Sequence, residues 1–105
     1  MPEKHLIAVR GAVQCKNEAR DMAVQVGALY DEILTRNKLA EEDLVSLIFS
    51  VTADLDEANP ATALRTSGRA ANVALFVTQE ARVKNGAGST DHIVRLLIHA
   101  YGDPE

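Results

Sequence analysis

The chain has 105 residues, of which 47% are hydrophobic and 25% charged, so it is long enough for one globular domain and too short for two. We therefore expect a single domain over residues 1–105, which excludes multidomain enzymes. The net charge of −4 argues against a nucleic-acid partner, and the chain has no Trp to stack on bases. Because a domain of this size leaves much apolar surface exposed, we also expect self-association.

Cysteine content and the amino-terminal sequence indicate the cellular setting. Cys15 is the single cysteine, so no disulfide can form within the chain, in agreement with a reducing compartment. The first residues show no signal-peptide pattern, and apolar runs such as residues 73–77 are far shorter than the roughly 20 residues of a membrane span. These features predict a cytoplasmic protein without a membrane partner.

The first half of the chain predicts a strand, a long helix and a second strand. Residues 6–13 are β-rich and apolar around one arginine, typical of a largely buried strand. Residues 17–37 form an amphipathic helix pattern for which Asn17 is a suitable N-cap, and residues 44–51 predict a strand covered on both faces. The apolar positions of the helix recur every three or four residues: Met22, Val26, Leu29, Ile33 and Leu34.

The second half predicts a short helix and two further strands. Pro60 suits the first position of a helix over residues 60–66. Residues 73–78 and 92–99 are apolar strand patterns, and residues 101–105 are expected to be a frayed end. This order predicts an α+β fold, a mixed β-sheet with one long and one short helix on one face.

Two arginines within apolar strand patterns, Arg10 and Arg95, are the most informative residues. A buried guanidinium is costly unless an anion satisfies it, and the arginine fork suits planar carboxylates. Either residue could instead lie on a solvated strand face or pair with a carboxylate of the fold. Arg65 on the short helix is also a candidate, whereas Glu80 after the third strand matters only if it converges with the arginines.

Other candidate sites are weak. Residues 84–90 are rich in glycine and polar residues, but they lack the lysine and the spacing of a phosphate-binding loop, so we expect a mobile loop. His5, His92 and His99 share no metal-ligand spacing with one another or with Cys15. We therefore expect neither a metal nor a cofactor, and we interpret Cys15 as a packed apolar residue.

Several motifs together resemble one family. Their order and spacing are similar to the trimeric, pseudo-α/β-barrel class of monofunctional chorismate mutases, often called bacillus-type, from about residue 6 to residue 99. The most specific pieces are V-R-G-A at residues 9–12 and V-T-x-D-L at residues 51–55. The others are N-P-A-T-A-L-R at residues 59–65, Gln79-Glu80, and I-V-R-L at residues 93–96.

The resemblance implies a function and a set of roles. It implies the rearrangement of chorismate to prephenate in the shikimate route to aromatic amino acids, in a cleft between neighbouring subunits of a homotrimer. Arg10 would bind a substrate carboxylate, and Arg95 would reach the ether oxygen of the breaking bond. Glu80 would accept a hydrogen bond from the ring hydroxyl, and Arg65 would organise the anionic end of the cleft.

The resemblance places further substrate-binding positions on the short helix and the third strand, at Asn59, Ala61, Thr62, Phe76 and Val77. At three of these positions the chain departs from the family. Asn59 stands where an aromatic residue is usual, Thr62 where a lysine is often found, and Val77 where a cysteine commonly lines the site. From these changes we expect weaker substrate binding.

The end of the sequence leaves alternatives open. The loop over residues 82–91 is longer than in the family, and a tail that brings a tyrosine over the substrate has no counterpart, because Tyr101 lies too early. One alternative is a non-catalytic or repurposed trimer that binds chorismate or a similar small dicarboxylate. Another is a purely structural trimer in which Arg10 and Arg95 form an ion network with Glu80.

Overall fold

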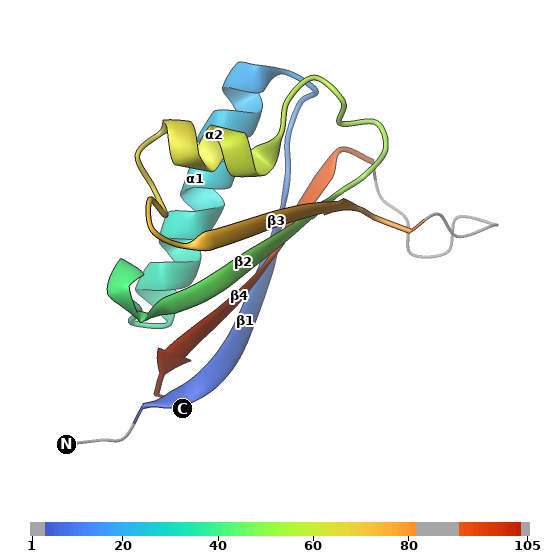
Figure 1. Cartoon of the computed structure of the whole chain (residues 1–105). Helices are drawn as coiled ribbons and strands as arrows, with labels where there is room; N and C mark the ends of the chain where they lie inside the picture. Colours follow the sequence, from blue (N-terminus) through green and yellow to red (C-terminus); the bar gives the residue numbers. More distant parts are fainter. Residues whose placement is uncertain (1–3, 82–90, 104–105) are drawn as a thin grey trace.

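A computed structural model describes residues 4–81 and 91–103 (Figure 1). The elements are β1 (His5–Gln14), α1 (Ala19–Arg36), the 3₁₀ turn η1 (Glu41–Asp43), β2 (Leu44–Val51), α2 (Pro60–Thr66), β3 (Ala74–Gln79) and β4 (Ile93–Gly102). The four strands form one sheet in the order β1-β4-β2-β3, in which β2 and β3 are parallel and the other pairs antiparallel. Within the described residues, no helix combines the length and apolarity that crossing a membrane requires.

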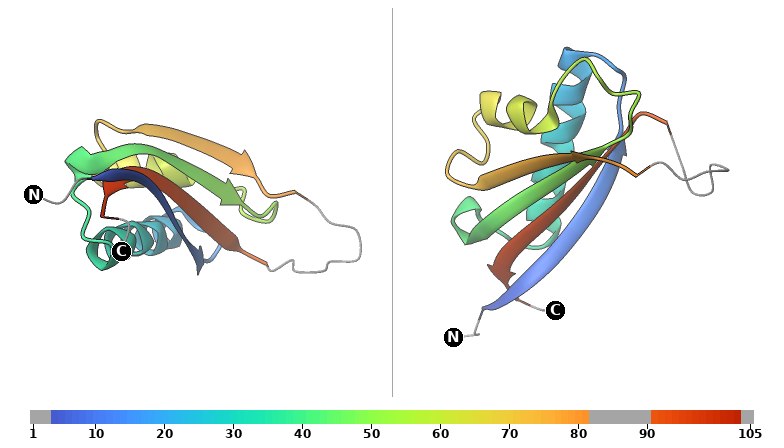
Figure 2. Two further views of the ribbon diagram at one scale, coloured as in Figure 1. Left: turned by 90° about the horizontal axis from the view of Figure 1, so that it is seen from below. Right: turned by 45° about the vertical axis from the view of Figure 1, so that its right-hand side comes forward.

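Both helices pack on one face of the sheet, which confirms the predicted α+β arrangement (Figure 1, Figure 2). Alternate residues of the two central strands point toward the helices and are fully buried, among them Leu47, Phe49 and Leu96. They meet the apolar side of α1, where Met22 and Val26 are also fully buried. Apolar residues at every second position of the strands and at every third or fourth position of α1 therefore pack together in one core.

Gly11 lets α1 approach β1 closely. It lies on the helix-facing side of β1, and a Cβ atom there would be 2.9 Å from Leu29 Cδ1 and 3.1 Å from Ile33 Cδ1. A larger residue would have to push these buried side chains aside. The glycine of the V-R-G-A motif thus has a packing reason, and its neighbour Arg10 points to the opposite face.

The opposite face of the sheet, which we call the open face, is uncovered within one chain. It carries exposed apolar side chains, Leu6 at 59%, Phe76 at 64% and Tyr101 at 50% exposure. The predictions that β1 is largely buried and that β2 is covered on both faces are therefore wrong for the single chain. Long apolar runs predicted the strands correctly, but in this chain both helices pack on the same side of them.

Two predicted boundaries also need correction. The N-cap of α1 is Glu18, because the side chain of Asn17 is engaged elsewhere: its Oδ1 accepts the backbone N–H groups of Asp56 and Glu57, both at 3.0 Å. The end of the chain is not frayed at Tyr101 and Gly102, since both belong to β4 and pair with the start of β1. The predicted loop over residues 84–90 lies outside the described residues.

Candidate active site

Arg10 and Arg95 lie on the open face, on the adjacent strands β1 and β4. Arg10 is opposite Leu97 in the antiparallel register, and Arg95 is opposite Ala12, so the two arginines are diagonal neighbours on the same face. Between them runs a groove of about 630 Å³, whose floor includes Ile48, Leu97 and the polar Ser50. The structure thus brings together the two arginines that the sequence had singled out. Both are exposed within one chain, so the buried guanidinium that the strand pattern suggested is not observed.

Glu80 pairs with Arg95 at the border of this groove, from the end of β3 on the other side of β2. It follows β3 directly, and its backbone N–H donates to the Val51 carbonyl at 2.8 Å, which continues the parallel ladder by one residue. Its carboxylate accepts a hydrogen bond from Nε of Arg95 and forms an ion pair with it. The Arg95 side chain is 45% exposed and that of Glu80 28% exposed, so the pair borders the groove rather than lying in the core.

Arg65 belongs to a different hollow at the edge of the sheet. β3 is an edge strand of the sheet, and a depression of about 390 Å³ lies between it and α2, lined by Ala61, Thr62, Arg65 and Val73 among others. The Arg65 guanidinium donates through Nη2 to the Val73 carbonyl at 2.6 Å. The structure therefore places Arg65, Ala61 and Thr62 together, but apart from the groove of Arg10 and Arg95.

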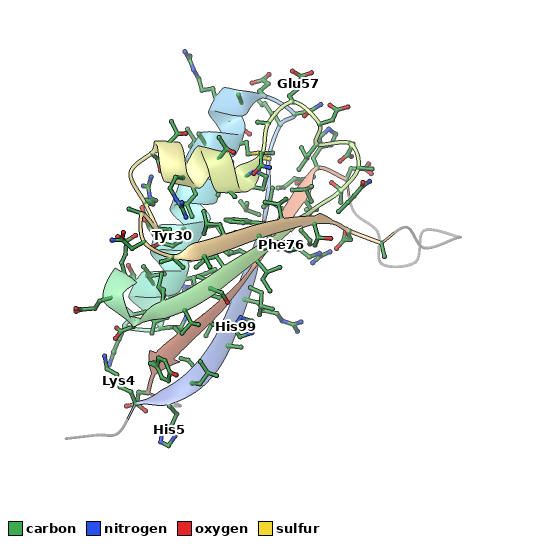
Figure 3. The ribbon with its side chains drawn as sticks, in the orientation of Figure 1. Lys4, His5, Tyr30, Glu57, Phe76 and His99 are labelled. Carbon is green, nitrogen blue, oxygen red and sulfur yellow. The ribbon has the colours of Figure 1, made fainter. Side chains whose placement is uncertain are left out.

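The three remaining predicted residues, Asn59, Phe76 and Val77, lie in different places. Asn59 caps α2, since its Oδ1 accepts the N–H groups of Ala61 at 2.9 Å and Thr62 at 3.2 Å. Phe76 projects from β3 on the open face (Figure 3), in register with Ile48 of the groove floor. Val77 points the other way and packs against the core beside Phe49.

Sequence reasoning missed two parts of this region. Ser50 lies opposite Arg95 on β2, and only the strand pairing reveals it. The second is a partly buried hydrogen bond that the hydroxyl of Tyr30, labelled in Figure 3, donates to the Glu41 carboxylate. Burial, followed by this hydrogen bond, raises the pKa of Tyr30. In the sequence Glu41 is one of three consecutive acidic residues, so no local signal marked it.

The chemistry available in the groove is binding and electrostatic stabilisation. Two guanidinium groups can hold carboxylates, an apolar floor suits a ring, and Glu80 offers an acceptor. Nothing among residues 4–81 and 91–103 groups three or more His, Cys, Asp or Glu side chains in a way that could hold a metal ion. Cys15 is buried away from solvent, at 5% exposure, and burial raises the pKa of its thiol, which supports its interpretation as a packed apolar residue.

Comparisons with known proteins agree with this geometry. A family model described as chorismate mutase type I matches residues 6–105. Among solved structures, a chorismate mutase from Clostridium thermocellum is 35% identical, with a TM-score of 0.84 over 94% of this chain and 86% of that chain. None of the curated protein sequences matches.

Proposed function

The chain belongs to the chorismate mutase type I family, and we propose that it converts chorismate to prephenate in a site that two neighbouring copies of the chain complete. The observation that carries the proposal is the Arg95–Glu80 ion pair beside Arg10, over a groove with an apolar floor. Membership in the family agrees with the function that the sequence motifs implied.

The reaction requires no nucleophile, metal ion or general base. It is an intramolecular Claisen rearrangement, in which the ether C–O bond breaks while a new C–C bond forms within the same molecule. The protein must hold the dianion in a compact, chair-like conformation and stabilise the charge that builds on the ether oxygen. Fixed cations supply both effects once a neighbouring chain covers the groove and excludes water.

Each charged residue of the groove has a role in this proposal. Arg10 binds a carboxylate of the substrate, and Arg95 donates to the ether oxygen as the bond breaks. Glu80 orients the Arg95 guanidinium through the observed ion pair and accepts a hydrogen bond from the ring hydroxyl. These roles follow from the family resemblance, and the common face of the three side chains supports them.

Arg65 requires a second chain in this proposal. Its hollow lies at the β3 edge and is separate from the groove, so one chain supplies Arg10, Arg95 and Glu80 while its neighbour supplies Arg65 with Asn59, Ala61 and Thr62. From β3 of that neighbour, Phe76 contributes its side chain from the open face, and Val77 contributes only its backbone because its side chain packs against the core. The exposed Leu6, Phe76 and Tyr101 on the open face support association of copies through this surface. We propose that the assembly is the homotrimer that the family resemblance implies, in which head-to-tail contacts close into a ring and give every groove a neighbour.

The first test is turnover by the purified protein. We expect chorismate absorbance in the ultraviolet to decay while prephenate appears, and a trimeric mass in solution. Binding of chorismate without decay would favour the alternative of a non-catalytic dicarboxylate-binding trimer.

The second test asks whether the site is shared between chains. Arg95→Ala and Arg65→Ala should each lower turnover strongly, whereas mixed trimers of the two should contain some sites with both intact halves. Random co-assembly of equal amounts should restore about a quarter of the sites, because roughly three quarters of the trimers are mixed and each has one intact site of three. If both halves came from one chain, mixing would restore nothing.

A further inference from the structure

One carboxylate oxygen of Glu41, in η1, anchors the turn between α2 and β3, residues 67–73. The backbone N–H of Ala70 donates to Glu41 Oε2 at 2.7 Å. Ala70 is fully buried and has a φ of 54°, a backbone conformation that an alanine rarely adopts and that its surroundings must hold in place. Glu41 satisfies this buried donor.

The same oxygen also accepts the hydroxyl of Tyr30. Tyr30 comes from α1, is 2% exposed and donates to Glu41 Oε2. Two donors from different elements thus converge on one oxygen of Glu41. A carboxylate fixed in this way has little freedom to move, so the position of Ala70 is set by α1 and η1 together.

Two hydrogen bonds connect Ala70 to Arg65 through Val73. The turn closes with a hydrogen bond from the Val73 N–H to the Ala70 carbonyl at 3.3 Å. The Val73 carbonyl in turn accepts Nη2 of Arg65 at 2.6 Å. The orientation of the Arg65 guanidinium therefore depends on where the turn places Val73.

The turn has a second, independent anchor. Arg69 donates from Nε and Nη2 to the two carboxylate oxygens of Asp31 on α1, at 2.9 and 2.8 Å, and from Nη1 to Ser67 Oγ at 2.9 Å. Its guanidinium lies over Gly27, where an added Cβ would be 3.1 Å from Arg69 Cζ. Loss of the Glu41 contact should therefore leave the turn attached and shift mainly its Ala70–Val73 part.

We propose that Glu41 is a positioning residue for the Arg65 half of the site, acting through the Ala70 N–H and the Val73 carbonyl. The proposal rests on the proposed function, because the role of Arg65 in substrate binding belongs to it. Glu41 touches no substrate and acts only by fixing the direction of the Arg65 side chain. Displacement of a substrate-positioning group by about 1 Å can cost on the order of a hundredfold in rate, so a remote anchor of this kind affects activity.

The test is a double-mutant cycle between Glu41→Ala and Arg65→Ala, read as kcat/KM for chorismate. Glu41→Ala should lower kcat/KM by about tenfold, chiefly through KM, because Arg65 remains present but is misplaced. In the Arg65→Ala background the same substitution should cause no further loss. Glu41→Gln, whose amide oxygen can still accept both donors, should recover most of the activity.

The controls separate positioning from general destabilisation. Glu42→Ala, an exposed neighbour in η1, should match wild type in kcat/KM and in melting temperature. If Glu41→Ala does not fold, Tyr30→Phe, which removes one of the two donors, takes its place in the cycle. A loss that is equally large with and without Arg65 overturns the positioning role.

The outcomes also separate this inference from the proposed function. If wild type turns over chorismate and Arg65→Ala is impaired, but the loss from Glu41→Ala persists undiminished in the Arg65→Ala background, only the positioning role fails. If wild type is inactive, or if Arg65→Ala retains full kcat/KM, the proposed role of Arg65 fails and the positioning role fails with it.

Discussion

Arg95 and Glu80 meet across an intervening strand. Arg95 lies on β4 opposite Ser50 of β2, and Glu80 extends β3 on the other side of β2, so their side chains join across β2. The pair therefore depends on the parallel register of β2 with β3 and the antiparallel register of β2 with β4. A guanidinium held in this way is already oriented when a ligand arrives, which is what electrostatic stabilisation of a transition state requires.

Arg95→Ala should reduce turnover by roughly a hundredfold or more, because removing one preorganised donor in comparable sites costs about 2.7–4 kcal/mol. The measurement is the rate of chorismate decay at saturating substrate. Arg36→Ala is the matched control, since Arg36 pairs with Glu32 on the exposed side of α1 and should leave turnover unchanged. An Arg95→Ala protein with the wild-type rate would refute the role given to Arg95.

The effects of Glu80→Ala on kcat/KM and on stability should show whether Glu80 acts in the active site or only supports the fold. Partly exposed ion pairs contribute about 0–1 kcal/mol, so urea unfolding should show a small loss of stability. We expect kcat/KM to fall by roughly tenfold to a hundredfold, the effect of losing a hydrogen bond to a charged group worth about 1.5–3 kcal/mol. The opposite result, a large stability loss with unchanged kinetics, would favour the purely structural ion network of Arg10, Arg95 and Glu80.

A bicyclic dicarboxylate that mimics the transition state should raise the melting temperature of wild type. At a hundred times its Kd such a ligand stabilises the protein by about 2.7 kcal/mol through mass action. Arg10→Ala, which removes a proposed carboxylate ligand, should lose most of this shift at the same ligand concentration. Identical shifts in the two proteins, measured by differential scanning fluorimetry, would show that Arg10 does not bind the ligand.

Gly11→Val should destabilise the fold by about 1–3 kcal/mol, the usual cost of forcing extra methyl groups into a packed contact. The new side chain would press on Leu29 and Ile33 of α1, whose terminal methyl groups already lie within 3.1 Å of the position of an added Cβ. Gly11→Ala adds less volume and should cost less. Equilibrium urea unfolding of the three proteins would contradict this account if Gly11→Val were as stable as wild type.

The free energy of unfolding should fall at acidic pH because the carboxylates of Glu41 and Asp54 have lowered pKa values in the folded protein. Hydrogen bonds from Tyr30 and then from the Ala70 N–H lower the pKa of Glu41 below its ordinary value of 4.5. The Thr52 hydroxyl and the His92 N–H lower the pKa of Asp54 below 3.8. A carboxylate whose pKa is lower in the folded state stabilises the protein fully above its unfolded pKa, and the contribution is lost as the pH falls through the folded pKa.

We therefore expect the free energy of unfolding to decline as the pH drops below about 4.5, the range in which the unfolded carboxylates take up protons. Glu41→Gln should show a shallower decline over this range than wild type, since it removes one of the titrating groups. Urea unfolding as a function of pH measures both slopes. Parallel curves would mean that Glu41 titrates alike in the folded and unfolded chains.

The elements with strong local periodicity were predictable from the sequence. The spacing of Met22, Val26, Leu29 and Ile33 indicated α1, and Pro60 marked the first residue of α2, because both signals come from residues close together in the chain. The boundary at Asn17 was wrong because the partners of its side chain are residues 56 and 57, which are distant in sequence. The extension of β4 to Gly102 likewise depends on pairing with the start of β1.

The site was predictable in its residue types but not in its arrangement. Arg10 and Arg95 attracted notice as charges in apolar strands, yet only the register shows that they share a face. The separation of Arg65 from them is a matter of tertiary structure, and so is the approach of Glu41 to Ala70. Such contacts join segments whose relative placement is set by the packing of the whole core, which local patterns do not encode.

The pairing of His5 with Gly102 places the beginning of the first strand next to the end of the last one (Figure 1). Adjacent strands lie about 4.7–4.9 Å apart, so a short linker could join Lys4 to Asp103 without disturbing the ladder. The chain is thus suited to circular permutation. A permuted protein with new ends in a loop should keep the same sheet, because every strand would retain its pairing partners.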